Sequence, residues 1–212
     1  MKKSLFRYFG GKYLLAPKLI SLFPRHTCYV EVFGGAGNVL FQKPSSKVEI
    51  FNDINSDIFG LFRVLQSDYE KFVEALRFIP YSREEHREMK AQLKTETCEF
   101  RRAVLWFVVQ HMSFSGISSA SHFSTDKHWN KARNWQSVKE TLHFFCKRIQ
   151  NVVLENKDFS DILDIYDGSE TFFYLDPPYV PEMRKGSAYE HEISLDDHER
   201  LIDCLLGLKM SR

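Results

Sequence analysis

The stretch FFYLDPPYV, residues 172–180, runs from four apolar or aromatic residues into an acid, two prolines and a tyrosine. An acid at the carboxyl end of a buried strand lies in the crevice where parallel α/β sheets bind their ligands. Pro177 and Pro178 have no N–H and a fixed φ, so they form a rigid turn whose carbonyl oxygens can accept hydrogen bonds. Tyr179 adds a flat aromatic face.

These groups suit a planar molecule that carries an exocyclic amine. The Asp176 carboxylate and the Pro177 carbonyl would accept both N–H bonds of the amine while Tyr179 stacks on the ring. Holding both hydrogens on acceptors favours a pyramidal nitrogen, whose lone pair can attack a methyl group in line. The plainer alternative is that the two prolines only end an edge strand.

A glycine-rich stretch, VEVFGGAGN at residues 30–38, lies between a predicted strand and a helical turn. Glycines there let the backbone turn tightly and approach a ligand, although tight packing of the strand on the helix is an alternative reason for them. Asp53 ends the next predicted strand, where an acid in doubly wound folds accepts hydrogen bonds from both ribose hydroxyls. Its alternative role is that of a helix N-cap or turn residue. Together the loop and the acid predict a ribose-bearing cofactor.

The glycine loop does not favour NAD. It lacks the G-x-G-x-x-G spacing, and no phosphate-binding motif follows it. A cofactor that contains adenosine without phosphates fits better, and S-adenosylmethionine is the common one.

Short apolar segments alternate with helical patterns along the chain. This alternation predicts a parallel, doubly wound, Rossmann-like α/β sheet. Its strands are expected at 29–32, 48–51, 151–154 and 171–175. Helices are expected at 13–23, 57–76, 83–94, 99–112, 135–149 and 194–207, with Ser82 and Ser194 as N-caps.

The stretch between the second and third strands is too long for one crossover connection. We therefore expect residues 57–149 to form an inserted, mainly helical subdomain. Residues 1–56 and 150–212 would form the cofactor-binding catalytic domain. The chain has 212 residues, of which 43% are hydrophobic, enough for one sizeable core with such an insertion.

The net charge is only +1, but basic residues gather in two segments. Residues 1–27 carry six Lys and Arg and no acid, and residues 122–150 carry six Lys and Arg against two acids. Two such segments in a neutral chain would form a patch for a polyanion. Composition alone favours the plainer interpretation, in which they are ordinary solvated helix faces.

Composition also points to a cytoplasmic protein without a metal. No run approaches the ~20 apolar residues of a membrane span, and no signal peptide begins the chain. The four cysteines are far apart and form no C-x-x-C pair, so they are expected to be reduced thiols. The eight histidines show no metal-ligand spacing.

The chain resembles the Dam-like DNA adenine-N6 methyltransferases of the DPPY type. The resemblance covers essentially the whole chain, in the order cofactor motif, recognition domain and catalytic DPPY. It is carried by FRYFGGKY (6–13), YVEVFGGAGN (29–38), EIFNDINSD (49–57), the block around SFSG (113–116), and LDPPYVPEMRKGSAYEHEISLDDH (175–198).

The resemblance implies S-adenosylmethionine as the cofactor and double-stranded DNA as the partner. The methyl acceptor would be the N6 amine of an adenine flipped out of the duplex, because a stacked base cannot reach such a pocket. It also implies a cytoplasmic location in a bacterial or archaeal cell, or an origin in a phage, and leaves the oligomeric state open.

The resemblance also assigns roles to residues. Tyr8 and Lys12 would lie beside the cofactor and the target base, and Asp158 and Phe159 would read the cofactor adenine. The catalytic residues would be Asp176, Pro177, Pro178 and Tyr179. The cofactor-binding residues would be Tyr8, Gly10, Gly11, Lys12, Glu31, Phe33, Gly34, Gly35, Gly37, Asn38, Asp53, Ile54, Asp158, Phe159 and Asp176. Candidate DNA contacts, each more plainly interpreted as scaffold, are Arg101, Arg102, Ser113, Ser115, His122, Lys127, Lys131 and Arg133.

The chain departs from the family pattern at its end, GLKMSR, where four strands are predicted and about seven are expected from the resemblance. We therefore expect a sheet that is incomplete at the C-terminus. An expression fragment, a truncated gene product and completion by another chain all remain open. The alternative function is a catalytically inactive remnant that binds S-adenosylmethionine, DNA or both. Methylation of a protein amide is a further alternative, but Asp instead of Asn at position 176 argues against it.

Overall fold

The structure is a computed structural model, and it describes residues 4–8, 10–114, 122–179 and 193–208. Its contacts divide the chain into two compact units. The first unit contains residues 12–59 and 151–212, and the second contains residues 2–11 and 60–150. The described residues of the N-terminal segment, 4–8 and 10–11, thus group with the helical insertion, whereas the sequence predicts that they belong to the catalytic domain.

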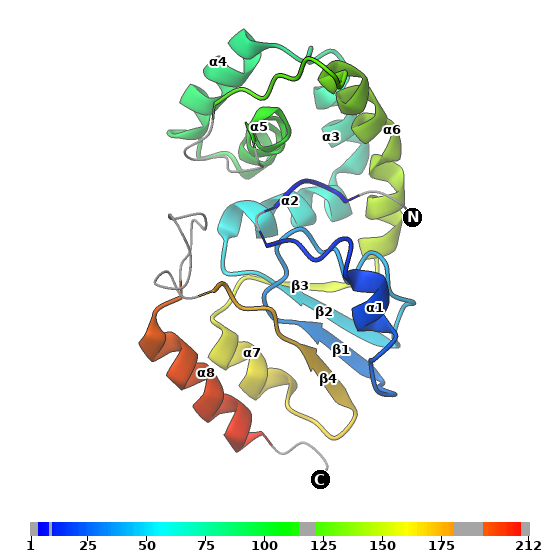
Figure 1. Cartoon of the computed structure of the whole chain (residues 1–212), viewed down its shortest axis with the longest axis vertical. Coiled ribbons are helices and arrows are strands. Elements are labelled where there is room, and N and C mark those ends of the chain that lie inside the picture. Colours follow the sequence, from blue (N-terminus) through cyan, green and yellow to red (C-terminus); the bar gives the residue numbers. More distant parts are fainter. Residues whose placement is uncertain (1–3, 9, 115–121, 180–192, 209–212) are drawn as a thin grey trace. The chain divides into compact units, whose positions relative to one another are not determined.

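The first unit is built on a four-stranded sheet in the order β3-β2-β1-β4 (Figure 1). All three strand pairs are parallel. The predicted doubly wound α/β class is confirmed, and each strand lies within two residues of its expected position. The strands are β1 (Cys28–Glu31), β2 (Val48–Asn52), β3 (Val153–Glu155) and β4 (Thr171–Tyr174).

Two helices, α7 (Phe159–Tyr166) and α8 (Leu195–Gly207), run side by side against one face of this sheet (Figure 1). The core between them and the sheet consists of Val30, Val32, Ile50, Phe159, Ile162, Leu163, Phe173 and Leu201. Helix α7, which has only eight residues, was not predicted from the sequence. The apolar spacing of Phe159, Ile162 and Leu163 was the available signal.

Aromatic side chains cover the opposite face of the sheet. Phe23 follows the short helix α1 (Ala16–Ile20), and its ring centroid lies 4.6 Å from that of Phe172. It also lies 5.9 Å from the rings of both Tyr29 and Tyr174. Both faces of the parallel sheet are therefore covered, as such sheets require.

The second unit is helical. Its helices are α3 (Tyr69–Leu76), α4 (Arg83–Leu93), α5 (Glu99–Met112) and α6 (Lys131–Ile149), while α2 (Ser56–Ser67) begins in the first unit and ends in the second. The prediction of one helix over 57–76 is wrong, because the backbone leaves the helical region at Asp68. Within the described residues, none of the helices has the length and apolar character that a membrane crossing needs.

Helix ends follow the expected capping chemistry. Ser82 accepts a hydrogen bond from the amide of Glu84, and Ser194 forms a capping box with Asp197. Helix α6 begins four residues before its predicted start. There the Asn130 side chain accepts from the amide of Arg133 at 2.8 Å.

The core of the second unit explains why the N-terminal segment belongs to it. Leu5 and Phe6 are at most 1% exposed, and the ring of Phe6 lies 5.1 Å from that of Trp106 in an edge-to-face arrangement. The side chain of Gln110 donates to the carbonyl of Arg7 at 2.7 Å. These contacts anchor residues 4–7 to α5.

We predict that Gly34→Ala destabilises the protein. A Cβ atom at Gly34 would overlap the ring of Phe51, which is fully buried in β2. The free energy of unfolding, measured in urea, should fall by about 1–3 kcal/mol, the usual cost of overpacking.

Gly207→Ala is the matched control, because a Cβ there meets nothing within 4 Å. Alanine at that helical position should be neutral or slightly stabilising, by less than about 1 kcal/mol. Equal effects of the two substitutions would contradict the steric explanation for Gly34.

Candidate active site

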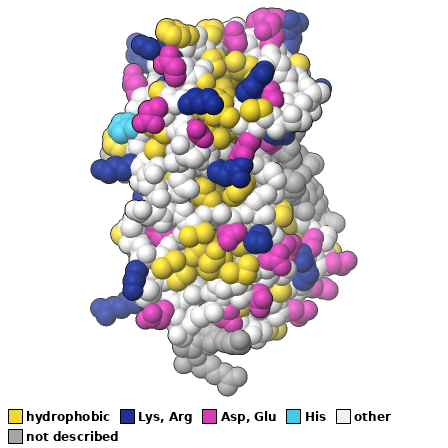
Figure 2. Space-filling view, turned by 180° about the vertical axis from the view of Figure 1, so that it is seen from behind, with side chains coloured by type: hydrophobic (Ala, Val, Ile, Leu, Met, Phe, Trp, Pro, Cys, Tyr) yellow, Lys and Arg dark blue, Asp and Glu magenta, His cyan; other side chains and the backbone are white. Residues whose placement is uncertain are grey.

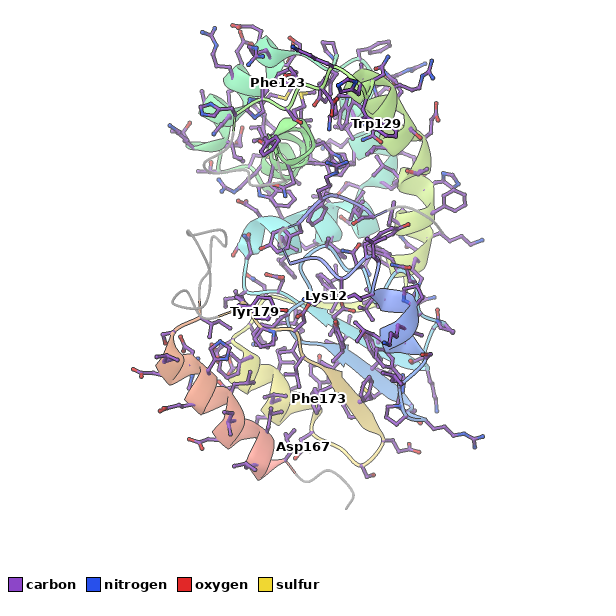
Figure 3. The ribbon with its side chains drawn as sticks, viewed as in Figure 1. Lys12, Phe123, Trp129, Asp167, Phe173 and Tyr179 are labelled. Atoms are coloured by element: carbon purple, nitrogen blue, oxygen red, sulfur yellow. The ribbon has the colours of Figure 1, made fainter. Side chains whose placement is uncertain are left out.

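The catalytic motif predicted from the sequence begins two residues after the end of β4. Lys12, which lies just before α1, places its Nζ atom 2.7 Å from Oδ1 of Asp176. The same Nζ lies 5.4 Å from the centre of the Tyr179 ring, and Figure 3 shows the two side chains together. The fold thus brings the lysine of the FGGK motif to the DPPY motif from the other end of the chain.

Helix α8 adds a contact to this turn that the sequence analysis did not predict. Nε2 of His198 lies 3.1 Å from the carbonyl oxygen of Pro178. A carbonyl can only accept, so Nε2 carries the hydrogen and donates it. Helix α8, which follows the motif in the sequence, therefore holds the carbonyl group of the second proline, Pro178.

The glycine loop leaves β1 and turns back over the end of β2. Gly35 and Gly37 have φ values of 52° and 63°, in the left-handed region that favours glycine. The amide of Gly34 donates to the carbonyl of Asn52 at 2.8 Å, which ties the loop to β2. Asn38, which follows the loop, is buried, and its carbonyl accepts from Gln42 at 3.1 Å.

Asp53 connects this loop to the end of β2. One of its carboxylate oxygens accepts from the amide of Gly35 at 2.6 Å, and the other accepts from the amide of Asn55 at 2.8 Å. The side chain therefore acts as a turn residue, which was the alternative role considered for it. A carboxylate oxygen can accept more than one hydrogen bond, so these contacts are compatible with the ribose role of Asp53, which stays a prediction.

Asn52 is a structural residue of the site that the sequence analysis missed. It is 1% exposed, and its side-chain amide donates to the carbonyls of Val32 and Lys157. Its side-chain oxygen accepts from the amide of Lys157 at 2.9 Å. This one side chain links the carboxyl ends of β1 and β2 to the loop after β3. Its position directly before Asp53 was the available signal.

A cavity of about 390 Å³ opens at this edge of the sheet. That volume is within the range of small-molecule sites. Four predicted cofactor residues line it, from three separate segments, and Pro178 of the catalytic motif forms part of its wall. Its lining comprises Val32, Phe33, Asn52, Ile54, Lys157, Asp158, Phe159, Pro178, Ile193, Asp197 and Arg200.

Asp158 stands at the N-terminus of α7, where its carboxylate accepts from the amide of Ser160 at 3.0 Å. Burial alone would raise the pKa of Asp158. The hydrogen bonds from Arg200 and Ser160 outweigh that effect and hold the pKa below its ordinary value. The carboxylate is therefore an anion at neutral pH and can only accept hydrogen bonds.

Glu31 lies beneath the glycine loop, at the end of β1. It is 2% exposed and accepts hydrogen bonds from the hydroxyl of Tyr29 at 2.7 Å and the amide of Leu40 at 2.9 Å. Burial raises the pKa of Glu31 to about 8, although both hydrogen bonds oppose the shift. Through its hydrogen bond with the amide of Leu40, Glu31 holds the segment that follows the glycine loop.

The FGGK motif lies across the boundary between the two units. Tyr8, Gly10 and Gly11 belong to the second unit, and Lys12 belongs to the first. Gly10 has a φ of 73°, in the left-handed region that favours glycine, and the amide of Gly11 donates to the carbonyl of Tyr8 at 3.1 Å.

Among the candidate DNA contacts, Ser113 is buried in the second unit. Its hydroxyl lies 2.9 Å from Nε2 of His86, and its backbone forms an antiparallel bridge with Phe123. The amide of Phe114 donates to the carbonyl of His122 at 2.9 Å. Ser115 lies outside the described residues.

The basic side chains among the candidate DNA contacts lie in different parts of the second unit. Arg102 donates to the carbonyls of Leu93 and Glu96, and Arg101 pairs with Glu96 at 3.0 Å, so both hold the connection between α4 and α5. Lys127 and Lys131 line a shallow surface depression. Figure 2 shows basic and acidic side chains intermixed over the face that it presents.

Arg133 lies in the first turn of α6, which has no acid there. Its amide is the donor to the Asn130 cap. Its backbone thus has a structural role, and the DNA contact assigned to its side chain stays a prediction.

Comparison with known proteins gives a family match over most of the chain. Residues 8–212 match the sequence model of the D12 class N6 adenine-specific DNA methyltransferases. The DNA adenine methylase of Salmonella typhi is 29% identical over 190 residues, which cover 85% of this chain and 67% of that protein. The DNA adenine methylase of Escherichia coli K12 is 27% identical over the same shares. A Type II methyltransferase of Lactococcus lactis is 27% identical over 95% of this chain and 75% of its own length.

We predict that Glu31→Gln changes how stability depends on pH. The folded-state pKa of about 8 lies above the ordinary value of 4.5, so the folded protein binds a proton that the unfolded chain releases between these values. The free energy of unfolding that Glu31 contributes is therefore present below pH 4.5 and is lost as pH rises toward 8.

Relative to Glu31→Gln, the wild-type protein should lose roughly 1–3 kcal/mol of stability between pH 5 and pH 8. Urea titrations at both pH values measure this difference. Glu170→Gln, at an exposed position in the turn before β4, is the control and should show no such trend. A constant difference between wild type and Glu31→Gln would contradict the raised pKa.

Proposed function

Because the chain belongs to the D12 class N6 adenine-specific DNA methyltransferase family, we propose that it methylates the N6 amine of an adenine flipped out of double-stranded DNA. S-adenosylmethionine is the proposed methyl donor. The observation that carries this proposal is that Pro178 belongs to the DPPY turn and also lines the cavity formed by the predicted cofactor residues. The proposed cofactor cavity and the catalytic turn are therefore adjacent, and both belong to the first unit.

The residues around the cavity fit an adenosine-containing cofactor. Phe33 and Phe159, whose ring centroids are 5.9 Å apart, would contact the adenine ring, and the Asp158 carboxylate would accept from its amine. Asp53 would accept from the ribose hydroxyls, and the glycine loop would let the backbone approach the methionine part. When bound, S-adenosylmethionine supplies a methyl group on a sulfonium centre.

The DPPY turn would bind the target base. The Asp176 carboxylate and the Pro177 carbonyl accept the two N–H bonds of the N6 amine, which concentrates its lone pair on the side of the methyl donor. Methylation requires the amine to lose one proton, and the Asp176 carboxylate is the basic group on that amine. Lys12 orients this carboxylate through the 2.7 Å ion pair.

Tyr179 would stack on the flipped base, since its side chain is 56% exposed and has a face to offer. His198 holds the adjoining Pro178 carbonyl and so stiffens the turn. A rigid set of acceptors costs no reorganisation when the reaction occurs.

The second unit would recognise the DNA. His122, Lys127, Lys131 and Arg133 are the proposed contacts, with Ser113 and Ser115 as further candidates. Contacts to phosphates would set the position of the protein on the duplex, and contacts to base edges would set the recognised sequence. The proposed place of the reaction is the cytoplasm of a bacterial or archaeal cell.

We predict that Asp176→Ala abolishes methylation. Without the carboxylate the amine keeps its lone pair delocalised in the ring, so the rate should fall at least 100-fold, the cost of losing one key catalytic group. The protein is incubated with S-adenosylmethionine and unmethylated DNA of mixed sequence, and N6-methyladenine is measured by mass analysis of the digested nucleosides.

Asp164→Ala, an exposed acid of α7, is the control and should retain wild-type activity. An active Asp176→Ala protein would remove Asp176 from the mechanism. No N6-methyladenine from the wild-type chain would favour the alternative of a remnant that binds cofactor or DNA without turnover.

We also predict that Asp53→Ala weakens the binding of S-adenosylhomocysteine by about 1–3 kcal/mol, the usual cost of stranding hydrogen-bond partners. The amides of Gly35 and Asn55 lose their acceptor as well. The free energy of unfolding should therefore fall by a similar amount, about 1–3 kcal/mol.

Calorimetric titration and urea unfolding measure the two effects separately. Unchanged affinity with reduced stability would leave Asp53 as a turn residue only.

A further inference from the structure

Arg200 on α8 reaches the carboxylate that is proposed to read the cofactor adenine. Its Nη1 lies 3.0 Å from Oδ1 of Asp158, and its Nη2 lies 3.0 Å from Oδ2. Two parallel bonds of this kind fix the direction of a carboxylate as well as its charge. Nη2 also bonds Asp197 at 3.1 Å, one turn earlier on the same helix, which holds the guanidinium in place.

The same guanidinium covers the neighbouring aromatic residue. Its central carbon lies 4.3 Å from the centre of the Phe159 ring, a cation–π distance. Arg200, Asp158 and Phe159 all line the cavity of about 390 Å³. One side chain from α8 thus contacts both residues at the N-terminus of α7 that are assigned to the cofactor adenine.

The two carboxylate oxygens of Asp158 differ in whether they can accept a further hydrogen bond. Oδ1 accepts from the amide of Ser160 at 3.0 Å, from the Ser160 hydroxyl at 2.6 Å and from Arg200, so its lone pairs are used. Oδ2 accepts from Arg200 at 3.0 Å. A carboxylate oxygen has two acceptor positions, which leaves Oδ2 as the atom able to take a ligand N–H.

We propose that Arg200 is a positioning residue for the cofactor: it holds Asp158 so that Oδ2 accepts a hydrogen bond from the 6-amino group of the adenine. The inference rests on the proposed function, because it requires an adenosine-containing ligand in this cavity. The cavity exists with the Arg200–Asp158 pair formed. The pair therefore forms a wall of the site and does not fill it.

The test compares two ligands that differ only at the amine. One is S-adenosylhomocysteine, and the other is its analogue with hydrogen in place of the purine 6-amino group. Both are titrated calorimetrically into the wild-type chain and into Arg200→Gln. Arg200→Gln should weaken S-adenosylhomocysteine about tenfold, as expected for a lost charged hydrogen bond. It should weaken the desamino analogue by less than about twofold, because that ligand does not use Oδ2.

Further variants sharpen the comparison. Arg200→Lys keeps the charge but not the parallel bonds, so its effect should lie between those of wild type and Arg200→Gln. In a protein that already carries Asp158→Asn, adding Arg200→Gln should weaken the binding of S-adenosylhomocysteine little further. The reason is that the two residues act on the ligand through one interaction. Glu199→Gln, an exposed neighbour on α8, should bind both ligands as the wild type does.

Equal weakening of the two ligands by Arg200→Gln would overturn the proposal, since Arg200 would then only support the fold. Tighter binding would also overturn it, since Arg200 would then compete with the adenine for Asp158. If the wild-type chain binds S-adenosylhomocysteine but Arg200→Gln does not discriminate between the two ligands, only the proposed role of Arg200 is wrong. If the wild-type chain binds neither ligand, the proposed cofactor is wrong as well. The ratio of the two affinities is measured on folded protein alone, so it does not depend on how much of each variant folds.

Discussion

The parallel pairing of β1 with both β2 and β4 is the constraint on which the rest of the first unit depends. Parallel strands all end at the same edge of the sheet, so the residues that follow each strand must converge there. The glycine loop follows β1, Asp53 follows β2, Asp158 follows β3 and Asp176 follows β4. Groups that are far apart in the chain become neighbours because of strand direction alone.

Hydrogen bonds from buried polar side chains then hold this edge in one arrangement. Asn52 joins the ends of two strands to the loop after a third, and Asp53 fastens the glycine loop to β2. Buried polar groups are costly unless they are paired. Burying these polar groups costs free energy, but once they are hydrogen-bonded they make this edge of the sheet rigid. Rigidity suits a site whose hydrogen-bond acceptors must be in place before the substrate binds.

Helix α8 ties the catalytic turn to the cofactor cavity. His198 contacts Pro178, and Arg200, two residues later, contacts Asp158. The apolar side of the same helix packs on the sheet through Leu201. The packing of one amphipathic helix thus sets the position of two polar contacts, and a shift of that helix would disturb the turn and the cavity together.

The sequence by itself determined the fold class, the four strands, most helices and the family, because hydrophobic periodicity and the motifs DPPY and FGGAGN are local features of the chain. It did not show α7, the break at Asp68, or that residues 4–7 pack on α5. Nor did it assign to Asn52, His198 or Arg200 the contacts that they make at the site, because those contacts depend on what lies opposite each residue. Tertiary structure decided these points, because a side chain becomes part of a site or a core only through partners that the fold brings to it from distant segments.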